Sequence, residues 1–311
     1  MAESSQNILQ CLILGAGPAG LSAALYAARA NLKPVVLSGM DLGGQISKTD
    51  RVENYPGFPE GIDGLELVSL FQKQAERFGT EIVFDSATEV DLSERPFKVT
   101  TYGAEYLAES LIITTGASVR ELGVPGENEF TGKGVSYCGT CDGHFFKEKD
   151  LVVVGGGDSA LKEGIFLTRF AKSVTIIHRR DELRAGYYLA NKAKENPKIN
   201  FVWDTVVTEI IGDKTVNSVR LKNKKTGEEE VQSIDGVFIF IGHTPNTDLF
   251  KDQLDMDEMG YLLIDEKMHT SKSGVFAAGE VGDPHFQQVV ISTGMGAAAA
   301  MEVVEFLEEE S

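Results

Sequence analysis

Residues 10–20, which read QCLILGAGPAG, decide the fold class of this 311-residue chain. The first five form an apolar run typical of a short buried strand, and three glycines with the spacing G-x-G-x-x-G follow. An alanine-rich stretch, 21–29, then predicts a helix, and the apolar residues 34–37 predict a second strand. This order of strand, glycine turn, helix and strand opens many dinucleotide-binding folds.

The turn needs glycine at each of these three positions for a different physical reason. Gly15 permits the tight turn, Gly17 lets the backbone approach a pyrophosphate, and Gly20 lets the helix pack closely on the strand. The free N–H groups at the helix N-terminus favour phosphate binding. The turn therefore indicates a nucleotide site, although a glycine turn that serves packing alone has the same spacing. The fingerprint also expects an acid at the end of the second strand, where Ser38 and Gly39 stand instead.

The same pattern recurs 140 residues later. An apolar strand at 151–154 runs into GGGDSA at 155–160, a helical stretch follows at 161–170, and 174–177 predict the next strand, which ends in HRRDELR. The fingerprint has an acid there to select a ribose 2′-hydroxyl, whereas guanidinium groups suit a 2′-phosphate. Arginines 179, 180 and 184 thus favour NADP(H) at this second unit. The alternative is a solvated cluster of charges at a strand end.

The rest of the chain fits around these two units. Apolar runs predict strands at 111–116, 237–241 and 275–279, a hairpin of 219–223 with 228–234, and a final helix at about 296–307. Linkers are expected near 117–118 and 242–244. We therefore predict an α/β protein with two Rossmann-like, FAD/NAD(P)-binding domains, the second inserted into the first. Residues 1–117 and 244–311 form one domain in this prediction, and 118–243 form the other.

Composition excludes several classes of function. The net charge of −18, from 29 Lys and Arg against 47 Asp and Glu, argues against nucleic-acid binding and against attachment to an anionic membrane. No apolar run reaches the about 18 residues that a membrane-spanning helix needs, and residues 1–7 lack the features of a signal peptide. Three cysteines are too few for a disulfide scaffold, so we expect a cytoplasmic protein.

Cys138 and Cys141 form a C-x-x-C motif between the two glycine turns. This spacing occurs in structural zinc sites, in thioredoxin-like domains, in inert buried pairs and in redox dithiols. Zinc needs four ligands, and beyond His144 no further ligand is evident. Residues 142–150 read as turn and loop rather than as the amphipathic helix of a thioredoxin-like domain. A redox dithiol fits best, and we expect no metal.

Two further residues bear on this motif. Asp142 follows the pair directly and is either a proton donor and acceptor for the thiols or a plain turn residue. The third cysteine, Cys11, lies in the first apolar strand, where we expect it to be a small core residue.

Taken together, these motifs resemble those of the low-molecular-weight thioredoxin reductases, flavoproteins of the pyridine nucleotide–disulfide oxidoreductase class. The resemblance extends over nearly the whole chain and involves several motifs in the same order. They are GAGPAG at 15–20, GGQ at 43–45, ENYPG at 53–57, CGTCDG at 138–143, GGGDSA at 155–160, HRRDELR at 178–184 and FAAG at 276–279.

The resemblance implies a homodimer with FAD in the outer domain and NADPH in the inserted domain. The residues that it places beside FAD are Gly15, Ala16, Gly17, Pro18, Ala19, Gly20, Ser38, Gly39, Gly43, Gly44, Gln45, Asn54, Gly116, Gly279, Glu280, Val281, Gln287, Gln288 and Val289. The residues that it places beside NADPH are Gly157, Asp158, Ser159, Ala160, His178, Arg179, Arg180 and Arg184.

The resemblance also implies a reaction, in which NADPH reduces FAD, FAD reduces the Cys138–Cys141 disulfide, and the dithiol reduces a small thioredoxin. In this family the second cysteine, here Cys141, faces the flavin, and Asp142 corresponds to the acid–base residue. Rotation of the inserted domain about the two linkers, which would act as hinges, alternates the partners of the flavin.

Three residues depart from the usual pattern of this family. Glu280 replaces an aspartate, Gln287 replaces an arginine, and Lys162 stands where acids are usual. These departures keep open reduction by ferredoxin or by another donor than NADPH. A flavin-dependent dithiol oxidase and a non-catalytic nucleotide-binding regulator are further alternatives.

Overall fold

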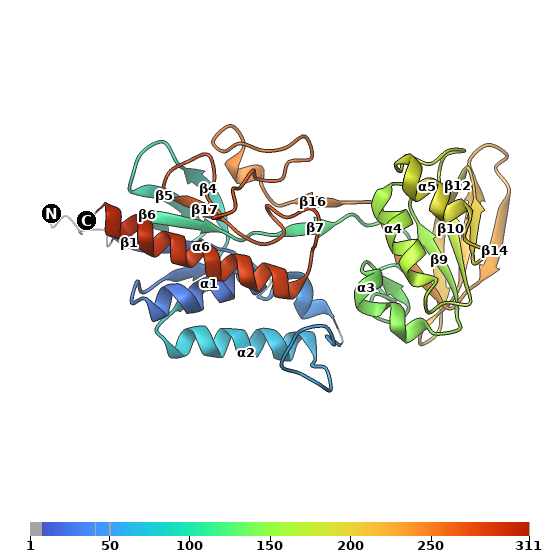
Figure 1. The fold of residues 1–311 in the computed structure, drawn as a ribbon, viewed down its shortest axis with the longest axis horizontal. Coiled ribbons are helices and arrows are strands. Elements are labelled where there is room, and N and C mark those ends of the chain that lie inside the picture. The colour runs from blue at the N-terminus through green and yellow to red at the C-terminus, as the bar shows by residue number, and fades with distance from the viewer. Residues whose placement is uncertain (1–7, 41, 50, 311) are drawn as a thin grey trace. The chain divides into compact units, whose positions relative to one another are not determined.

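The computed structural model describes residues 8–40, 42–49 and 51–310, and Figure 1 shows the fold. The chain divides into two compact units, an outer unit of Met1–Ser118 with Thr244–Ser311 and an inserted unit of Val119–His243. The first boundary lies one residue after the expected one, and the second coincides with it. Residues 1–7, on which the signal-peptide expectation rests, lie outside the described residues.

A seven-stranded sheet forms the centre of the outer unit (Figure 1). Its strands follow the order β3-β2-β1-β6-β5-β4, and β17 pairs with β6 outside this order. The ladders among β1, β2, β3, β6 and β17 are parallel, whereas β4 and β5 extend the sheet as antiparallel strands. The bounds are β1 Ile8–Leu14, β2 Val35–Leu37, β3 Glu81–Val83, β4 Ala87–Asp91, β5 Phe97–Thr101, β6 Glu105–Ile113 and β17 Val275–Ala277.

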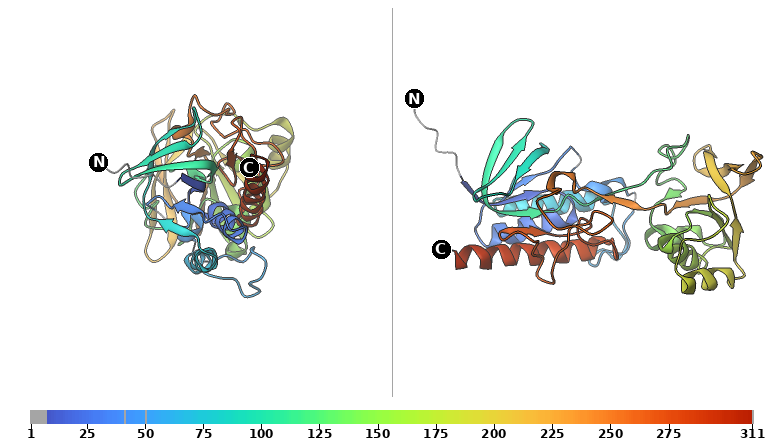
Figure 2. Two further views of the ribbon diagram at one scale, coloured as in Figure 1. Left: turned by 90° about the vertical axis from the view of Figure 1, so that its left-hand side faces the viewer. Right: turned by 90° about the horizontal axis from the view of Figure 1, so that it is seen from above.

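Within its described residues, the outer unit has three α-helices, α1 Pro18–Arg29, α2 Gly64–Arg77 and α6 Val289–Glu309, with short 3₁₀ turns at Gly44–Lys48 and Asp248–Phe250. Helices α1 and α6 run alongside each other (Figures 1 and 2), and small residues such as Ala23, Ala27 and Ala300 share their buried core. The contact is close, because a Cβ atom on Gly296 would lie 2.0 Å from the carbonyl oxygen of Ala19.

Both predicted helices of this unit are present but are longer than expected. Helix α1 begins at Pro18 rather than at residue 21, because proline in the first turn lacks an N–H group that would have no helical partner. Helix α6 begins at Val289 rather than at 296. By length and composition, α6 is long and apolar enough to cross a membrane, so our expectation that no segment reaches this length was wrong. One face of α6 packs on α1, and the most apolar 18-residue window of α6 is only 22% buried within the chain.

A five-stranded parallel sheet, in the order β11-β10-β9-β15-β8, forms the centre of the inserted unit. Its bounds are β8 Val135–Ser136, β9 Asp150–Val154, β10 Ser173–Ile177, β11 Ile199–Val202 and β15 Gly236–Ile239. A second, antiparallel sheet consists of β12 Thr205–Gly212, β13 Val216–Asn223 and β14 Glu229–Ser233. The hairpin of β13 and β14 confirms the prediction made from the sequence.

The helices of the inserted unit are α3 Gly139–Asp142, α4 Asp158–Leu167 and α5 Tyr187–Lys194, and the 3₁₀ turn Gly143–Phe146 follows α3 directly. Helix α4 begins three residues before the predicted helix, immediately after the second glycine turn. The expected linkers are not plain loops, since β7 Ala117–Val119 and β16 His243–Pro245 pair as a two-stranded ladder.

Candidate functional site

The first glycine turn joins β1 to α1 in a conformation that needs glycine. Gly15 has a φ angle of +114°, and a Cβ atom there would lie 2.4 Å from the carbonyl oxygen of Thr114. A Cβ atom on Gly20 would lie 1.9 Å from the carbonyl oxygen of Gly15. Gly17 differs from these two, because its nearest neighbour would be 4.0 Å away. Its side-chain position is therefore open space in front of the helix N-terminus.

The N-terminus of α1 has the features of an anion-binding site. Gly17 is the N-cap of α1, and no side chain caps the helix. The loop of Gly43 and Gly44 lies over the turn, since the Gly43 N–H donates to the carbonyl oxygen of Ala16 at 3.0 Å. A Cβ atom on Gly44 would lie 3.9 Å from the α-carbon of Gly17. Uncapped N–H groups next to glycines without side chains are what a bound pyrophosphate requires, so these residues fit a dinucleotide.

The other residues predicted beside FAD gather around this turn to different degrees. Gly279 packs on the turn, because its Cβ atom would lie 2.9 Å from that of Ala19. Ala16, Ala19 and Val281 are buried, so their side chains belong to the core beneath the turn. The Ser38 hydroxyl donates to the neighbouring Gly39 carbonyl. At the far end of the set, the Gly116 carbonyl accepts a hydrogen bond from the backbone N–H of Asn246.

Glu280 has a partly buried carboxyl group in this site. Gln45 donates from Nε2 to the Glu280 carboxylate at 2.6 Å and to the Ala117 carbonyl at 2.7 Å. Burial, and secondarily the neighbouring Asp283 carboxylate, raises the pKa of Glu280 to about 7, although the hydrogen bond from Gln45 opposes this shift. The group therefore changes charge near neutral pH.

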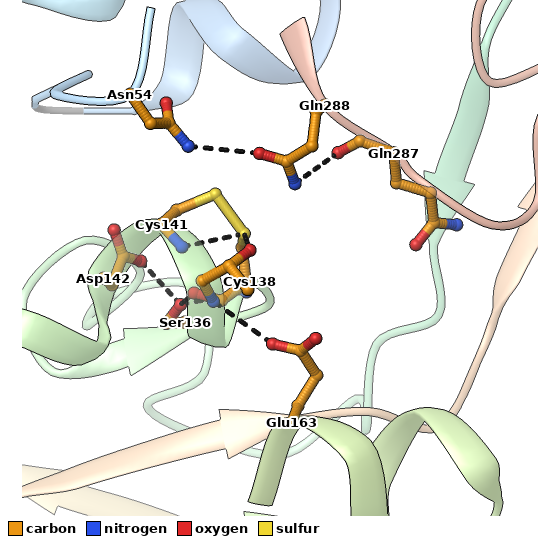
Figure 3. Close-up of a disulfide and its surroundings, with 9 residues drawn as sticks. Asn54, Ser136, Cys138, Cys141, Asp142, Glu163, Gln287 and Gln288 are labelled. Carbon is orange, nitrogen blue, oxygen red and sulfur yellow. Dashed lines mark hydrogen bonds between the residues drawn. A yellow bond between two sulfur atoms is a disulfide. The ribbon is translucent and has the colours of Figure 1, made fainter. Parts of the chain in front are cut away.

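The segment before α6 forms a second polar cluster, seen at the top of Figure 3. Asn54 donates from Nδ2 to Oε1 of Gln288 at 3.1 Å, and Gln288 donates from Nε2 to the Gln287 carbonyl at 3.0 Å. Gln287 itself adopts a left-handed conformation, with φ of 52°. The structure thus brings Asn54 and Gln288 together, as expected of residues that share one ligand. Val289 is the first residue of α6 and has a partly buried side chain.

The second glycine turn, in the inserted unit, repeats the features of the first. Gly155 has a φ angle of +146°, and a Cβ atom there would lie 2.4 Å from the Phe240 carbonyl oxygen. Gly157 is the N-cap of α4, and no side chain caps this helix either. Asp158 accepts a hydrogen bond from the Gly186 N–H at 2.8 Å, which ties the start of α5 to the turn. Of the two residues that follow, Ser159 is exposed and Ala160 is buried.

The basic side chain of Arg184 lies beside this turn. A Cβ atom on Gly157 would lie 3.9 Å from a terminal nitrogen of Arg184, and the backbone N–H of Arg184 donates to the Gly156 carbonyl at 2.8 Å. Arg179, Arg180 and Arg184 are exposed, and within the described residues none of them forms an ion pair. In an acidic protein, Arg184 beside an uncapped helix, with the guanidinium groups of Arg179 and Arg180 close enough to lower the pKa of His178, fits the phosphates of NADP(H).

His178 precedes these arginines and is only 4% exposed. Its Nε2 atom has no hydrogen-bond partner among the described residues. Burial, together with the positive charge of the three arginines, lowers the pKa of His178, which favours the neutral imidazole. The ring also packs against Gly156, because a Cβ atom there would lie 2.3 Å from Nδ1.

Cys138 and Cys141 form a disulfide with a Cα–Cα distance of 5.3 Å (Figure 3). Both residues are half-buried and thus accessible. Cys138 is the N-cap of α3, and its Sγ atom accepts the N–H of Cys141 at 3.2 Å. Residues 142–150, which were predicted as turn and loop, comprise the last residue of α3, the 3₁₀ turn Gly143–Phe146 and a turn before β9, whereas the single helical turn α3 itself was not predicted. Four residues of α3 are too short for a hydrophobic periodicity that sequence analysis could detect.

Polar side chains hold the disulfide turn in place. Ser136 donates from Oγ to the Asp142 carboxylate at 2.6 Å and accepts the N–H of Cys138 at 3.1 Å. Glu163 of α4 accepts the N–H of Thr140 at 3.2 Å. Ser136 and Glu163 are not among the site residues predicted from the sequence, because neither lies in a motif that points to the thiols. Cys11 is fully buried, as predicted for a core residue, and burial raises its pKa to about 12.

No cluster of three or more His, Cys, Asp and Glu side chains that could hold a metal ion occurs in the part of the chain that the structure describes. The model of the pyridine nucleotide-disulphide oxidoreductase family matches residues 9–296. The chain belongs to this family. Pyridine nucleotide-disulphide oxidoreductases use a flavin and a pyridine nucleotide, which agrees with two uncapped dinucleotide turns and one disulfide.

Relatives of known structure or annotation resemble the whole chain. The thioredoxin reductase of Streptomyces coelicolor is 48% identical over 97% of this chain and 94% of its own length. That of Rickettsia felis is 50% identical over 96% of this chain and 98% of its own. The crystal structure of thioredoxin reductase from Streptococcus pyogenes matches with a TM-score of 0.93 at 43% identity, over 98% of this chain and 100% of that one. These similarities confirm the resemblance and the fold class inferred from the motifs.

Proposed function

We propose that this chain is an NADPH-dependent thioredoxin reductase of the low-molecular-weight type. Electrons pass from NADPH on the inserted unit, by way of FAD on the outer unit, to the Cys138–Cys141 disulfide and then to the disulfide of a thioredoxin. The accessible disulfide, in the same unit as an uncapped dinucleotide turn with unpaired arginines, carries this proposal.

Each nucleotide has its own set of groups in this proposal. A bound FAD supplies the two-electron chemistry that links a hydride donor to a disulfide. The N–H groups at the start of α1 bind its pyrophosphate, while Gln45, Asn54, Glu280 and Gln288 supply polar contacts. The N–H groups at the start of α4 bind the pyrophosphate of NADPH, and the arginines bind its 2′-phosphate.

The dithiol transfers its electrons by thiol–disulfide exchange. In the reduced pair, the N–H of Cys141 stabilises the thiolate of Cys138, which attacks one sulfur atom of the thioredoxin disulfide and forms a mixed disulfide. The Cys141 thiolate then attacks Cys138, which re-forms the Cys138–Cys141 bond and leaves thioredoxin with two thiols. The two protons that accompany the two electrons pass by way of Asp142, which lies beside the pair.

We also propose a homodimer in which the open face of α1 and α6 is covered by a second copy. A hollow of about 320 Å³ lies between α1, α2 and α6, lined by Leu25, Tyr26, Phe71 and Val290 among others. Tyr26, Val290 and Met301 are each more than 40% exposed on α1 and α6. An apolar surface of this kind commonly marks a protein interface. A disulfide reductase of this type is expected to work in the reducing cytoplasm.

An anaerobic titration with NADPH tests this proposal. We expect the flavin absorbance of the oxidised protein to bleach fully at low stoichiometry with NADPH and only slightly with NADH. Failure to bleach, while dithionite still reduces the flavin, would mean another donor, such as ferredoxin. Formation of peroxide in proportion to an added dithiol would support a dithiol oxidase instead.

A further inference from the structure

Glu163 connects the disulfide turn to α4, the helix that follows the second glycine turn. Its Oε2 atom accepts the Thr140 N–H at 3.2 Å, as Figure 3 shows below the disulfide. It also packs against Gly139, where a Cβ atom would lie 2.5 Å from Oε2. While the Glu163 carboxylate stays in this place, no residue with a Cβ atom fits at position 139. Glu163 lies in no motif that the family resemblance rests on.

Two acceptors, the Cys138 sulfur and the Glu163 carboxylate, take the backbone N–H groups of the disulfide turn. In α3 the sulfur of the N-cap, Cys138, takes the N–H of Cys141. The Glu163 carboxylate takes the N–H of Thr140, and the N–H of Gly139 also stabilises its charged form. N–H groups at the start of a helical turn are the groups that stabilise a cysteine thiolate. Glu163 therefore competes with the sulfur atoms for the same donors.

We propose that Glu163 is a positioning residue for the dithiol, which fixes the turn that carries both sulfur atoms and withholds two N–H donors from the Cys138 sulfur. This inference rests on the proposed role of Cys138 and Cys141 as the redox pair. It assigns to α4 a second role besides nucleotide binding, namely control of how readily the thiols ionise.

The charges around the turn give the sign of the effect. The charged or titratable side chains on the elements that carry the turn or pack against it are Asp142 of α3, His144 of the following 3₁₀ turn, and Asp158, Lys162 and Glu163 of α4. Of these, Glu163 makes direct hydrogen bonds to the turn, and burial raises its own pKa. A carboxylate next to a thiol disfavours the thiolate. Glu163 thus keeps the pair a stronger reductant than the free turn would be, because a less stable thiolate gives up its electrons more readily.

The substitution Glu163→Gln separates charge from shape, since glutamine keeps an oxygen for the Thr140 N–H but loses the negative charge. Holoenzyme is reduced with dithiothreitol, desalted without oxygen and alkylated with iodoacetamide across a range of pH. We expect the midpoint of Cys138 alkylation to fall by about half a unit to one unit in E163Q. Cys11 does not interfere, because it is buried and its pKa is raised to about 12.

The equilibrium of the pair is measured in the same samples. In buffers of oxidised and reduced dithiothreitol, we expect E163Q to shift the equilibrium toward the dithiol about three- to tenfold, as follows from a more stable thiolate. Gly139→Ala, which pushes the carboxylate away, should shift both quantities in the same direction. Glu195→Gln, which removes an exposed carboxylate at the end of α5, is the matched control and should shift neither.

The outcomes separate this inference from the proposed function. Unchanged alkylation midpoints and equilibria in both folded variants, E163Q and G139A, would overturn the role of Glu163. If E163Q fails to fold, G139A alone decides the question by the same two measurements. Failure of the wild-type dithiol to reduce thioredoxin would overturn the proposed function, while a shifted midpoint in E163Q would still show that Glu163 controls the thiols.

Discussion

A single methylene group distinguishes Glu280 from the aspartate that is usual in this family. The longer side chain accepts a hydrogen bond from the Nε2 atom of Gln45 at 2.6 Å and is partly buried near Asp283. In this environment the neutral carboxyl group is favoured, so its pKa is about 7. We propose that Glu280, as a carboxyl group that is half-ionised near neutral pH, makes the contacts of a bound flavin sensitive to pH.

The raised pKa of Glu280 has a consequence for stability. The folded state holds this proton up to about pH 7, whereas the unfolded chain releases it near 4.5, so stability falls as the pH rises between these values. A difference of about 2.5 units corresponds to about 3 kcal/mol. We expect urea unfolding of the flavin-free protein to show this loss in the wild type but not in Glu280→Gln. Parallel pH profiles of the two proteins would contradict the assignment.

The three arginines at the end of β10 make a second prediction at the scale of single residues. Each is unpaired within the described part of the chain, and a hydrogen bond between charged groups contributes about 1.5–3 kcal/mol. We expect Arg179→Ala or Arg180→Ala to raise the KM for NADPH about 10- to 100-fold and to leave the KM for NADH almost unchanged. Lys194→Ala, an exposed cation at the end of α5, is the control. An equal rise in KM for NADPH and NADH would mean that the arginines do not bind the 2′-phosphate.

At the scale of elements, glycines decide how closely helices approach strands and each other. Gly296 of α6 lies against the Ala19 carbonyl, whereas Gly294 of the same helix has no atom within 4 Å of its Cβ position. We expect Gly296→Ala to destabilise the protein by about 2 kcal/mol or more through overpacking. Gly294→Ala should leave stability unchanged or raise it by up to about 1 kcal/mol, since alanine favours a helix. Thermal unfolding of both variants compares them, and equal losses would contradict the close packing.

The sequence predicts the two βαβ units well, because short parallel strands that are buried on both faces read as continuous apolar runs. Strands β1, β9 and β10 lie within one or two residues of their predictions. The antiparallel strands β4 and β5 and helix α2 were not predicted from the sequence, because they have polar exposed faces and lie between the motifs. The hydrogen-bond partners of the disulfide turn were not predicted either, because Glu163 accepts the Thr140 N–H from a helix that begins 18 residues after Thr140.

At the scale of the whole molecule, we propose that a second copy of the chain covers the exposed apolar face of α1 and α6. We expect light scattering to give a mass of about twice 33.7 kDa for the wild type. Tyr26→Glu, which places a charge in the hollow between the helices, should shift the mass toward that of one chain. Val231→Glu, at an exposed apolar position of β14, should not. A monomeric wild type, or a Tyr26→Glu protein that remains dimeric, would contradict this interface.

In the proposed reaction, all electrons that reach thioredoxin pass through one disulfide. The two units each hold a dinucleotide turn, but only the inserted unit holds the cysteine pair. The most direct measurement counts thiols by mass spectrometry after anaerobic addition of NADPH, and again after addition of oxidised thioredoxin. We predict two new thiols, at Cys138 and Cys141, which disappear as two thiols appear on thioredoxin. Cys138→Ser and Cys141→Ser proteins should bind flavin but turn over thioredoxin at least about 10³-fold more slowly. A flavin that NADPH reduces while Cys138 and Cys141 remain oxidised, or either variant at full turnover, would contradict the account.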